Sequence, residues 1–445
     1  MTKGSVIRKV ALVAALAALA ACSSTAGAED PTPRATPSPS AAATTTGVKQ
    51  IKHVVVLMQE NRSYDSYFGK LHDEGQPASP AEPNTGNPDP VNIGQTITPF
   101  HTTQQCTVAD LNHSWNGTHA EWDNGQMDGF TAANVDPNDP NGSRTMGYFD
   151  KHTLPFYYGL ANTFAIADHY FASTLTQTFP NRFYLYAGTS FGHIRNDLPP
   201  AGGFNQKTVF QLLDQAHVTW KIYVSTFGVE QVFSYVQHHP AKLVKMSQYY
   251  KDAAAGKLPQ VSFVEADPFG DVNHESDEHP PANVQVGEKF THDVIQALVK
   301  SPNWLSSALF LTYDEHGGYY DHVAPPAAPK PDNIAPMLQP GDTPGAFDRY
   351  GIRVPTIVVS PFARKHFVGH TVYDHTSILR FIEKRFGLPA LTNRDKAANP
   401  MLGMFDFTKI SNRKPTILAA PVSTAGKQAC IAAHPNAVPA DPANA

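Results

Sequence analysis

Oxygen-bearing side chains follow three apolar segments of this sequence at the point where each segment ends. Glu60 and Asn61 follow the run 53–58, Glu265 follows the run 261–264, and Asp314 and Glu315 follow the run 308–313. Carboxylate and amide oxygens are the ligands that Ca²⁺, Mg²⁺ or Mn²⁺ prefers, while nearby histidines favour Zn²⁺ or Fe. One such residue can simply cap a helix, but the repetition predicts one divalent metal ion, with Glu60, Asn61, Asp314 and Glu315 as ligands.

Thr178 is the candidate nucleophile. It opens the segment TFPNR at 178–182, in which Pro180 suits the first turn of a helix. Thr178 is therefore expected just before a helix N-terminus, where free amides and the helix dipole favour an anion. A hydroxyl placed there beside a metal can attack a phosphate; the alternative is a threonine that only caps the helix.

Histidines are numerous and occur in local groups near the acidic segments. The groups are His113 with His119, His274 with His279, His316 with His322, and His370 with His375. A lone histidine is more often a hydrogen-bonded structural group than a ligand, but the grouping indicates acid–base or metal chemistry. None of the groups has the H-E-x-x-H spacing of a zinc peptidase.

A rival signal is the G-x-S-x-G pattern at 188–192, which would make Ser190 the nucleophile of a serine esterase. That motif needs a strand before the serine and a helix after it. The prolines Pro199 and Pro200 follow closely and forbid a long helix. The residues after Ser190 therefore do not fit the esterase motif. A non-catalytic surface-binding protein is a further alternative, but it would require a broken set of site residues.

Apolar runs alternate with helical patterns along the chain. Runs expected to be buried strands lie at 53–58, 219–224, 261–264, 308–313 and 354–359, and helical patterns lie at 209–213, 293–300 and 377–386. This alternation predicts an α/β fold with a mainly parallel central sheet flanked by helices. Ligands bind outside the carboxyl ends of strands in such sheets, so the acidic segments are expected to converge on one crevice.

Composition limits the class of protein. Lys and Arg number 34 against 39 Asp and Glu, a net charge of −5, which excludes nucleic-acid binding through bulk positive charge. Hydrophobic residues make up 41% of the chain, which is enough to exclude wholesale disorder. We expect one catalytic domain at 51–411, a Ser/Thr/Pro/Ala-rich tether at 23–50 and a Pro/Ala-rich tail at 412–445.

The first residues have the pattern of an export signal. Lys3, Arg8 and Lys9 precede a short apolar stretch that ends at Cys22 in a sequence resembling a bacterial lipobox. This pattern predicts a signal segment at 1–22 and a lipid anchor on Cys22, which would hold an exported protein at the membrane; a secretory signal without a lipid is the alternative. The two other cysteines, Cys106 and Cys430, are expected to pair in an oxidising compartment, unless both stay unpaired.

Five blocks, in order, resemble the bacterial phosphoesterase family of phospholipases C and acid phosphatases. The first block covers 53–69 and reads HVVVLMQENRSYDSYFG. The others are TFPNR at 178–182, YDEHGGYYDHV at 313–323, VPTIVVSPF at 354–362 and YDHTS at 373–377. The similarity spans about 51–388. It implies an alkaline-phosphatase-like core and hydrolysis of phosphate esters through a covalent intermediate.

The resemblance also implies roles for single residues. Thr178 matches the nucleophile, and His279 together with either His113 or His119 matches histidines of the phosphate site. Glu60, Asn61, Asp314 and Glu315 match the metal ligands, although the family often has Asp at the last position. Arg182, His316 and His322 are expected to bind substrate. The extra C-terminal domains of larger phospholipase C members are not expected after this core.

The expected reaction is attack of Thr178 on a phosphate ester, with a histidine protonating the leaving alkoxide. The metal would lower the pKa of the hydroxyl and stabilise charge on the phosphoryl oxygens. Phospholipase C is the first expectation and acid phosphatase is the alternative. Aromatic residues could surround a choline group or simply pack in the core, and the candidates are Tyr67, Trp115, Trp122, Tyr319 and Tyr320.

Overall fold

The computed structural model describes residues 47–76, 86–106 and 110–434. The predicted signal segment, the lipobox Cys22 and nearly all of the predicted tether lie outside the described residues. Val48 and Ile51 are already part of the buried core, so the compact region includes residues just before the expected domain start at 51. Across the described part of the chain, no helix is long and apolar enough to cross a lipid bilayer.

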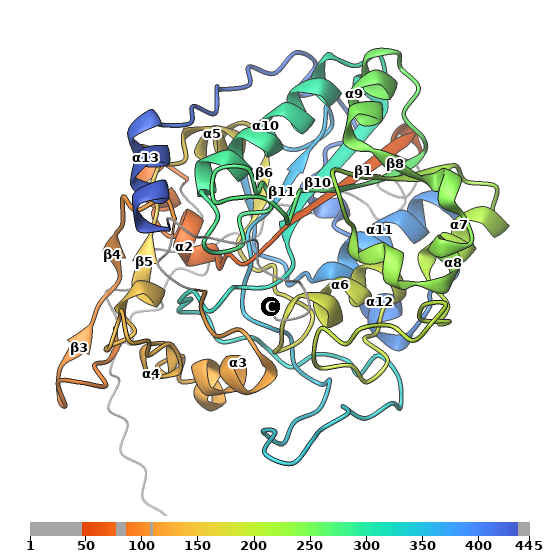
Figure 1. Cartoon of the computed structure of the whole chain (residues 1–445). Helices are drawn as coiled ribbons and strands as arrows, with labels where there is room; N and C mark the ends of the chain where they lie inside the picture. Colours follow the sequence, from red (N-terminus) through yellow and green to blue (C-terminus); the bar gives the residue numbers. More distant parts are fainter. Residues whose placement is uncertain (1–46, 77–85, 107–109, 435–445) are drawn as a thin grey trace, which may run out of the picture. The chain divides into compact units, whose positions relative to one another are not determined.

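An eight-stranded sheet forms the centre of the catalytic region, in the order β12-β6-β11-β10-β1-β9-β7-β8 (Figure 1). Its strands are β1 (His53–Gln59), β6 (Ala165–Ala167), β7 (Trp220–Val224), β8 (Leu243–Lys245), β9 (Val261–Glu265), β10 (Ser307–Tyr313), β11 (Thr356–Val359) and β12 (Phe367–Gly369). Only the pairs that involve β11 are antiparallel, so all the other strands share one direction. The predicted mainly parallel α/β fold is confirmed.

The five predicted strands are present as β1, β7, β9, β10 and β11. Each lies within two residues of the predicted bounds. The residues of β10 are all buried, which explains its continuous apolar run: a strand covered on both faces has no alternating polar side. The short strands β6, β8 and β12, three residues each, were not predicted.

Helices cover both faces of this sheet. They are α5 (Pro155–Thr163), α9 (Met246–Ala254) and α10 (Val284–Lys300) on one side, and α6 (Thr178–Ala187), α7 (Val209–Gln215), α11 (His375–Phe386) and α12 (Asn393–Ala397) on the other (Figure 1). Trp220 of β7 contacts Phe210 of α7 at 4.9 Å between ring centroids, while Tyr223 contacts Tyr249 of α9 at 5.3 Å. Odd and even positions of one strand thus face different helix layers.

The three predicted helical patterns correspond to α7, α10 and α11. Gly387, in left-handed conformation at φ 72°, ends α11 as expected. Helix α10 begins earlier than predicted, at Val284, because the Asn283 side chain accepts a hydrogen bond from the Gln285 amide and caps it.

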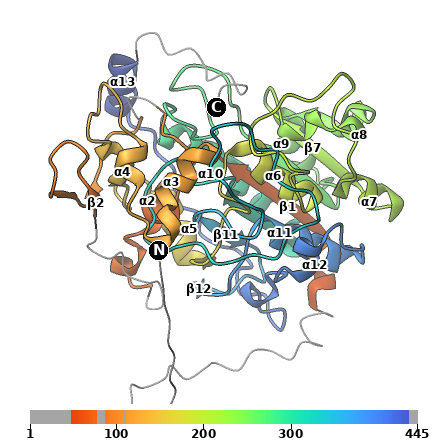
Figure 2. The ribbon, with the colours of Figure 1, turned by 90° about the horizontal axis from the view of Figure 1, so that it is seen from below.

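Smaller elements precede and follow the sheet. Helices α2 (Tyr64–Phe68), α3 (Trp115–Trp122) and α4 (Phe130–Ala133) come early in the chain, and α3 and α4 lie side by side (Figures 1 and 2). Helix α13 (Thr424–Ala433) lies within the predicted tail. Its Cys430 forms a disulfide with Cys106, and both are buried against Val272, which lies on the loop after β9.

Candidate active site

Arg182 joins the carboxyl ends of three neighbouring strands. Its Nη2 donates to Glu60 after β1 (2.9 Å), its Nη1 to Glu265 at the end of β9 (2.6 Å), and its Nε to Asp314 after β10 (3.1 Å). The expectation that the acidic strand ends converge is confirmed. Arg182 is only 1% exposed and all three guanidinium nitrogens are engaged by carboxylates, so it holds the site together. It also lines the cavity beside Thr178, and its substrate-binding role stays a prediction.

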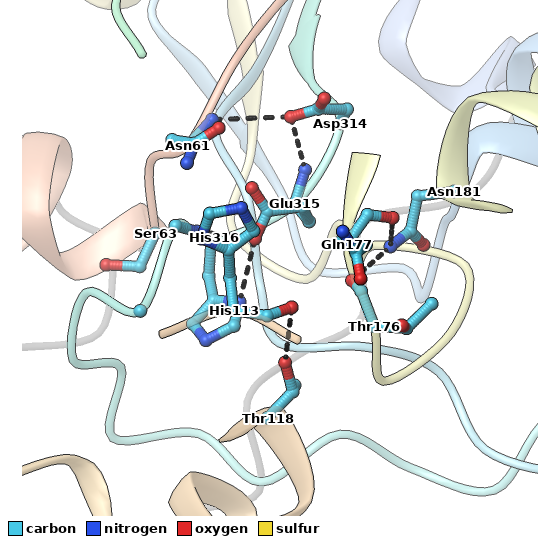
Figure 3. A network of polar contacts seen from close by, with 12 residues as sticks. Asn61, Ser63, His113, Thr118, Thr176, Gln177, Asn181, Asp314, Glu315 and His316 are labelled. Atoms are coloured by element: carbon cyan, nitrogen blue, oxygen red, sulfur yellow. Dashed lines mark hydrogen bonds and ion pairs between the residues drawn. The ribbon is translucent and has the colours of Figure 1, made fainter. Parts of the chain in front are cut away.

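The turns after β1 and β10 meet at Asp314. Its Oδ1 accepts hydrogen bonds from the amides of Asn61 (3.3 Å) and Glu315 (2.8 Å), and Figure 3 shows both amides directed at this carboxylate. Asn61 has φ 59°, a left-handed conformation that asparagine tolerates better than most residues. The backbone thus turns sharply after β1, and the Arg62 amide donates to the Glu315 carbonyl at 3.1 Å, which joins this turn to the one after β10.

Gly317 lets these two turns approach each other. A Cβ atom at this position would lie 2.5 Å from the Asn61 Cβ and 2.6 Å from the Asn61 carbonyl oxygen, and φ at Gly317 is 65°. A side chain here must therefore displace the backbone that carries Asn61.

We predict that Gly317→Ala lowers kcat/KM by about a hundredfold or more, because small displacements of catalytic groups are costly. The control is Gly94→Ala, where φ is also positive, at 86°, but where nothing lies within 4 Å of the added Cβ. Steady-state kinetics and thermal unfolding of both variants check this. Equal activity of the two variants would show that the close approach to Asn61 is unimportant.

Several buried polar atoms at this place have no hydrogen-bond partner among the described residues. They are Oδ1 and Nδ2 of Asn61, Oε1 of Glu315 and Oγ1 of Thr178. Buried polar atoms are nearly always satisfied in folded proteins, so this group indicates the place of a ligand. Three of the four are oxygens, and with Asp314 and Glu60 they form the donor set that a hard divalent cation prefers. The predicted ligands thus have the donor types that a metal ion requires, while the carboxylate and histidine atoms that lie within 4.8 Å of one another at this place, among the described residues, belong to Asp110, His113 and His279.

The carboxylates of this cluster are strongly perturbed. Burial raises the pKa of Asp314 to about 7, with Glu60 and Glu315 adding to the rise and Arg182 opposing it. Burial likewise raises the pKa of Glu60. Burial would also raise the pKa of Glu315, but the charges of His113 and His316 and the Gly317 amide hold it below its usual value. The site thus concentrates negative charge that a cation would neutralise.

Thr178 is the first residue of α6, one position further into the helix than expected. Pro180 lies in the first turn, where its missing N–H removes no helical hydrogen bond. The Asn181 side chain fixes the preceding loop, since its Nδ2 donates to the Thr176 (2.6 Å) and Gln177 (3.1 Å) carbonyls (Figure 3). The local sequence thus holds the Thr178 hydroxyl in a buried position, with Thr178 4% exposed and no hydrogen-bond partner for the hydroxyl in the part of the chain that the structure describes.

His113 and His279 form a pair, with ring centroids 5.8 Å apart. Nδ1 of His113 is hydrogen bonded to the Leu111 carbonyl (2.8 Å) and Nδ1 of His279 to the Pro280 carbonyl (2.7 Å). Neither Nε2 has a hydrogen-bond partner among the described residues, although Nε2 of His279 lies 3.7 Å from the Asp110 carboxylate. Burial would lower the pKa of His113, but the charges of Glu315 and Asp110 raise it to about 9. His113 is thus a charged donor at neutral pH.

Three other predicted histidines, His119, His316 and His322, have other partners than the His113–His279 pair. His119 is bonded to the Trp115 carbonyl (2.7 Å) and lies against the Trp115 ring, so His113 is the histidine of this segment that pairs with His279. His316 lies between Glu121 (2.7 Å) and Glu315 (3.3 Å), which occupy both of its nitrogens. His316 therefore has no ring nitrogen free of a carboxylate, and its substrate-binding role stays a prediction.

His322 lies in a different place from the His113–His279 pair, and its substrate-binding role stays a prediction. Its Nδ1 is held by Asp65 at 2.5 Å, in a separate buried cluster where Arg353 bridges Asp65 and Asp321. The serine esterase alternative fails on position too: Ser190 is fully buried and follows helix α6, whereas the motif requires a strand before the serine.

A cavity opens beside Thr178. Its lining includes Glu60, Thr178, Phe179, Arg182, Phe227, Glu265, Glu275, Asp277 and His279. The sequence prediction did not include Glu265, Glu275 or Asp277 among the site residues. Glu265 is the last residue of a buried strand, and Glu60 and Asp314 directly follow buried strands. This shared position could have identified Glu265 as a site residue. Glu275 and Asp277 come from an irregular loop, where no periodic pattern applies.

Comparisons with known proteins identify the family. The model of the Phosphoesterase family matches residues 51–389. Phospholipase C A of Mycobacterium tuberculosis is 33% identical over 417 residues, which cover 81% of this chain and 78% of that protein. Non-specific phospholipase C1 of Arabidopsis thaliana is 34% identical over 379 residues, covering 78% of this chain and 69% of that protein.

Non-hemolytic phospholipase C of Burkholderia pseudomallei is 31% identical over 407 residues, and the match spans 76% of this chain but 55% of that protein. Among solved structures, a protein in the alkaline phosphatase superfamily from Vibrio parahaemolyticus is 11% identical with a TM-score of 0.40, covering 82% of this chain and 70% of that chain. On the family match and the sequence relatives, the chain belongs to the phosphoesterase family and is a phosphoric ester hydrolase.

Proposed function

We propose that this protein is a phospholipase C, which cleaves phospholipids to diacylglycerol and a phosphorylated head group through a phosphothreonine at Thr178. The observation that carries the proposal is the buried, unpartnered Thr178 hydroxyl at the first turn of α6, facing a cavity that His279 also lines. The three relatives described above are phospholipases C by name, which supports the choice of a diester substrate.

The reaction proceeds in two displacements. Thr178 loses its hydroxyl proton to solvent as Oγ1 attacks phosphorus, the bond from phosphorus to the glycerol oxygen breaks, and Nε2 of His113 gives its proton to the leaving alkoxide. A water molecule then attacks the phosphothreonine and the bond from phosphorus to Oγ1 breaks. One proton of the water returns to Nε2 of His113, the other goes to Oγ1 of Thr178, and the phosphorylated head group leaves. His113 is suited to the donor role because its Nε2 has no hydrogen-bond partner among the described residues and its ring packs against His279, which lines the cavity beside Thr178.

Glu60, Asn61, Asp314 and Glu315 would hold the divalent metal ion next to Thr178. A bound divalent cation supplies positive charge that favours the threonine alkoxide and offsets charge on the phosphoryl oxygens. The protein contributes the turn at Asn61 and the Arg182 ion pairs, which fix the donor atoms before any ligand binds.

We predict that exhaustive chelation lowers kcat/KM by roughly a hundredfold or more and lowers the melting temperature. Both values should return when one of Ca²⁺, Mg²⁺, Mn²⁺, Zn²⁺ or Fe²⁺ is added back, and the melting temperature gives a readout independent of catalysis. Full activity and an unchanged melting temperature in protein shown to be metal-free by elemental analysis would contradict the metal assignment.

The competing function on the same scaffold is that of an acid phosphatase. One preparation should be assayed on phosphatidylcholine and on a simple phosphomonoester at matched concentration across pH. We expect diester cleavage, with diacylglycerol as product, to dominate. Dominant monoester cleavage would make the protein an acid phosphatase, and activity on neither substrate would overturn the hydrolase proposal for these substrates.

We further propose that the protein is exported and held at the membrane by a lipid on Cys22. The basic residues Lys3, Arg8 and Lys9, the apolar stretch and the lipobox support this. Expression with labelled palmitate should label the wild-type protein in the membrane fraction but not Cys22→Ala. Equal labelling of both would contradict the anchor.

A further inference from the structure

Glu278 is a fully buried carboxylate that the proposed reaction does not use. It lies between Asp277 and His279, which both line the cavity beside Thr178, whereas Glu278 is not among the described residues that line it. Its side chain is therefore directed into the protein interior. A buried carboxylate is costly unless other groups satisfy its oxygens, so its partners indicate what it does.

Three tyrosine hydroxyls donate hydrogen bonds to the Glu278 carboxylate. Oε2 accepts from Tyr67 of α2 (2.6 Å) and from Tyr313 of β10 (3.0 Å), and Oε1 accepts from Tyr157 of α5. Oε1 also accepts from Nε2 of Gln59, the last residue of β1 (3.2 Å). All four donors belong to regular helices or strands, so they fix the carboxylate to the rigid part of the fold.

Tyr67 is thus a partner of a buried carboxylate, although the sequence made it a candidate for a choline site. None of the five aromatic candidates for that site is among the described residues that line the cavity beside Thr178.

The segment that carries Glu278 has no regular structure of its own. Residues 266–283, between β9 and α10, form neither helix nor strand. Glu278 has φ 74°, a left-handed conformation that is strained for a residue with a long side chain. Such a conformation persists only where surrounding contacts hold it, and the four hydrogen bonds to the carboxylate do so here. Gly287 of α10 leaves the room, since a Cβ atom there would overlap the Glu278 side chain.

Two of the four donors directly precede site residues. Gln59 precedes Glu60, Tyr313 precedes Asp314, and the two donors are register partners on neighbouring strands. Both β1 and β10 pair with a strand on each side, so the sheet holds these donors without help from the loop. Loss of the buried carboxylate would therefore release the loop and its cavity-lining histidine, and would leave the strand ends in place.

We propose that Glu278 is a positioning residue, which fixes His279 at the cavity by anchoring the 266–283 loop to the ends of β1 and β10. Nε2 of His279 is buried, lines the cavity with Thr178 and has no hydrogen-bond partner among the described residues, so it can donate to a phosphoryl oxygen. The inference rests on the proposed function and adds to it a residue that acts without touching the substrate.

The test is a double-mutant cycle on Glu278→Gln and His279→Ala. The wild-type protein, both single variants and the double variant are assayed on phosphatidylcholine, and calorimetry measures the binding of inorganic phosphate to each. Glutamine keeps the size of the side chain but has one acceptor oxygen where the carboxylate has two. The control is Glu383→Gln: Glu383 is also fully buried, but it lies on α11, where it pairs with Arg380 at 2.8 Å.

We expect Glu278→Gln to lower kcat/KM by about thirtyfold or more and to weaken phosphate binding by about fivefold or more. When His279 is already alanine, the same change should alter either quantity by less than about twofold, because its effect passes through the histidine. The control should stay within about twofold of wild type. Equal effects of Glu278→Gln in both backgrounds, or wild-type values in the single variant, would overturn the positioning role.

If Glu278→Gln does not fold, Tyr313→Phe takes its place, because it removes one of the four donors and keeps the ring. We expect a loss of about threefold or more in kcat/KM that again disappears in the His279→Ala background. Its control is Tyr249→Phe, since the Tyr249 hydroxyl is buried and donates to the Val294 carbonyl (3.1 Å) on the other side of α9.

The two readouts separate this inference from the proposed function. A wild-type protein that binds phosphate but does not cleave phosphatidylcholine would overturn the phospholipase C proposal, while the cycle on phosphate binding would still decide the role of Glu278. Cleavage of phosphatidylcholine with an additive cycle would overturn the role of Glu278 alone.

Discussion

Thr178→Ala is expected to lower kcat/KM for phosphatidylcholine by about a thousandfold or more, without a change in melting temperature. The proposed reaction uses the hydroxyl that this substitution removes. The fold should not lose a hydrogen bond, because the hydroxyl forms none with the described residues. Steady-state kinetics and thermal unfolding of purified variants give both quantities.

Thr178→Ser is the matched control. It keeps the hydroxyl at the first position of α6, so we expect activity within about tenfold of wild type. Near-wild-type turnover by Thr178→Ala would contradict the assigned nucleophile, as would a Thr178→Ser variant that is as inactive as Thr178→Ala while still folded.

Arg182→Met is expected to reduce the free energy of unfolding by about 3–5 kcal/mol. The substitution keeps most of the side-chain volume but leaves Glu60, Glu265 and Asp314 without the buried cation that bridges them. Removing one partner of a buried ion pair costs far more than losing an exposed one, because the remaining charge stays out of water. Urea unfolding at neutral pH measures the difference.

Arg413→Met is the control, because Arg413 is exposed and the same chemical change there should cost less than about 0.5 kcal/mol. If Arg182→Met does not fold, Arg182→Lys provides the comparison: it keeps one charge but cannot reach three carboxylates in the same geometry, so an intermediate loss is expected. If Arg182→Met unfolded with the same urea midpoint as the wild-type protein, the bridging role of Arg182 would be contradicted.

The sequence was sufficient to predict the central sheet and the place of the site. Strands such as β1 and β10 are buried on both faces, so their apolar runs are continuous and easy to recognise. Since parallel strands end at one edge of the sheet, the residues after them had to meet, as Glu60, Glu265 and Asp314 do. The direction of β11 was not predictable, because apolar content is the same in parallel and antiparallel strands.

The partners of individual polar side chains could not be predicted from their types. Arg182 and His322 both looked like substrate ligands, but the fold supplies carboxylates that engage them first: Glu60, Glu265 and Asp314 for Arg182, and Asp65 for His322. Which of His113 and His119 reaches the site depends on the direction of α3, which places His119 against Trp115. Such choices are set by tertiary packing and not by local pattern.

The covalent intermediate tests the central claim most directly. The protein should be mixed with phosphatidylcholine, quenched in acid within one turnover and digested, and the peptide that contains Thr178 analysed by mass spectrometry. We predict phosphocholine attached to Thr178 in the wild-type protein and no modified peptide in Thr178→Ala. The account would be contradicted if Thr178 stayed unmodified during active turnover while the reaction inverted the configuration at phosphorus. That result would mean that water attacks the phospholipid directly.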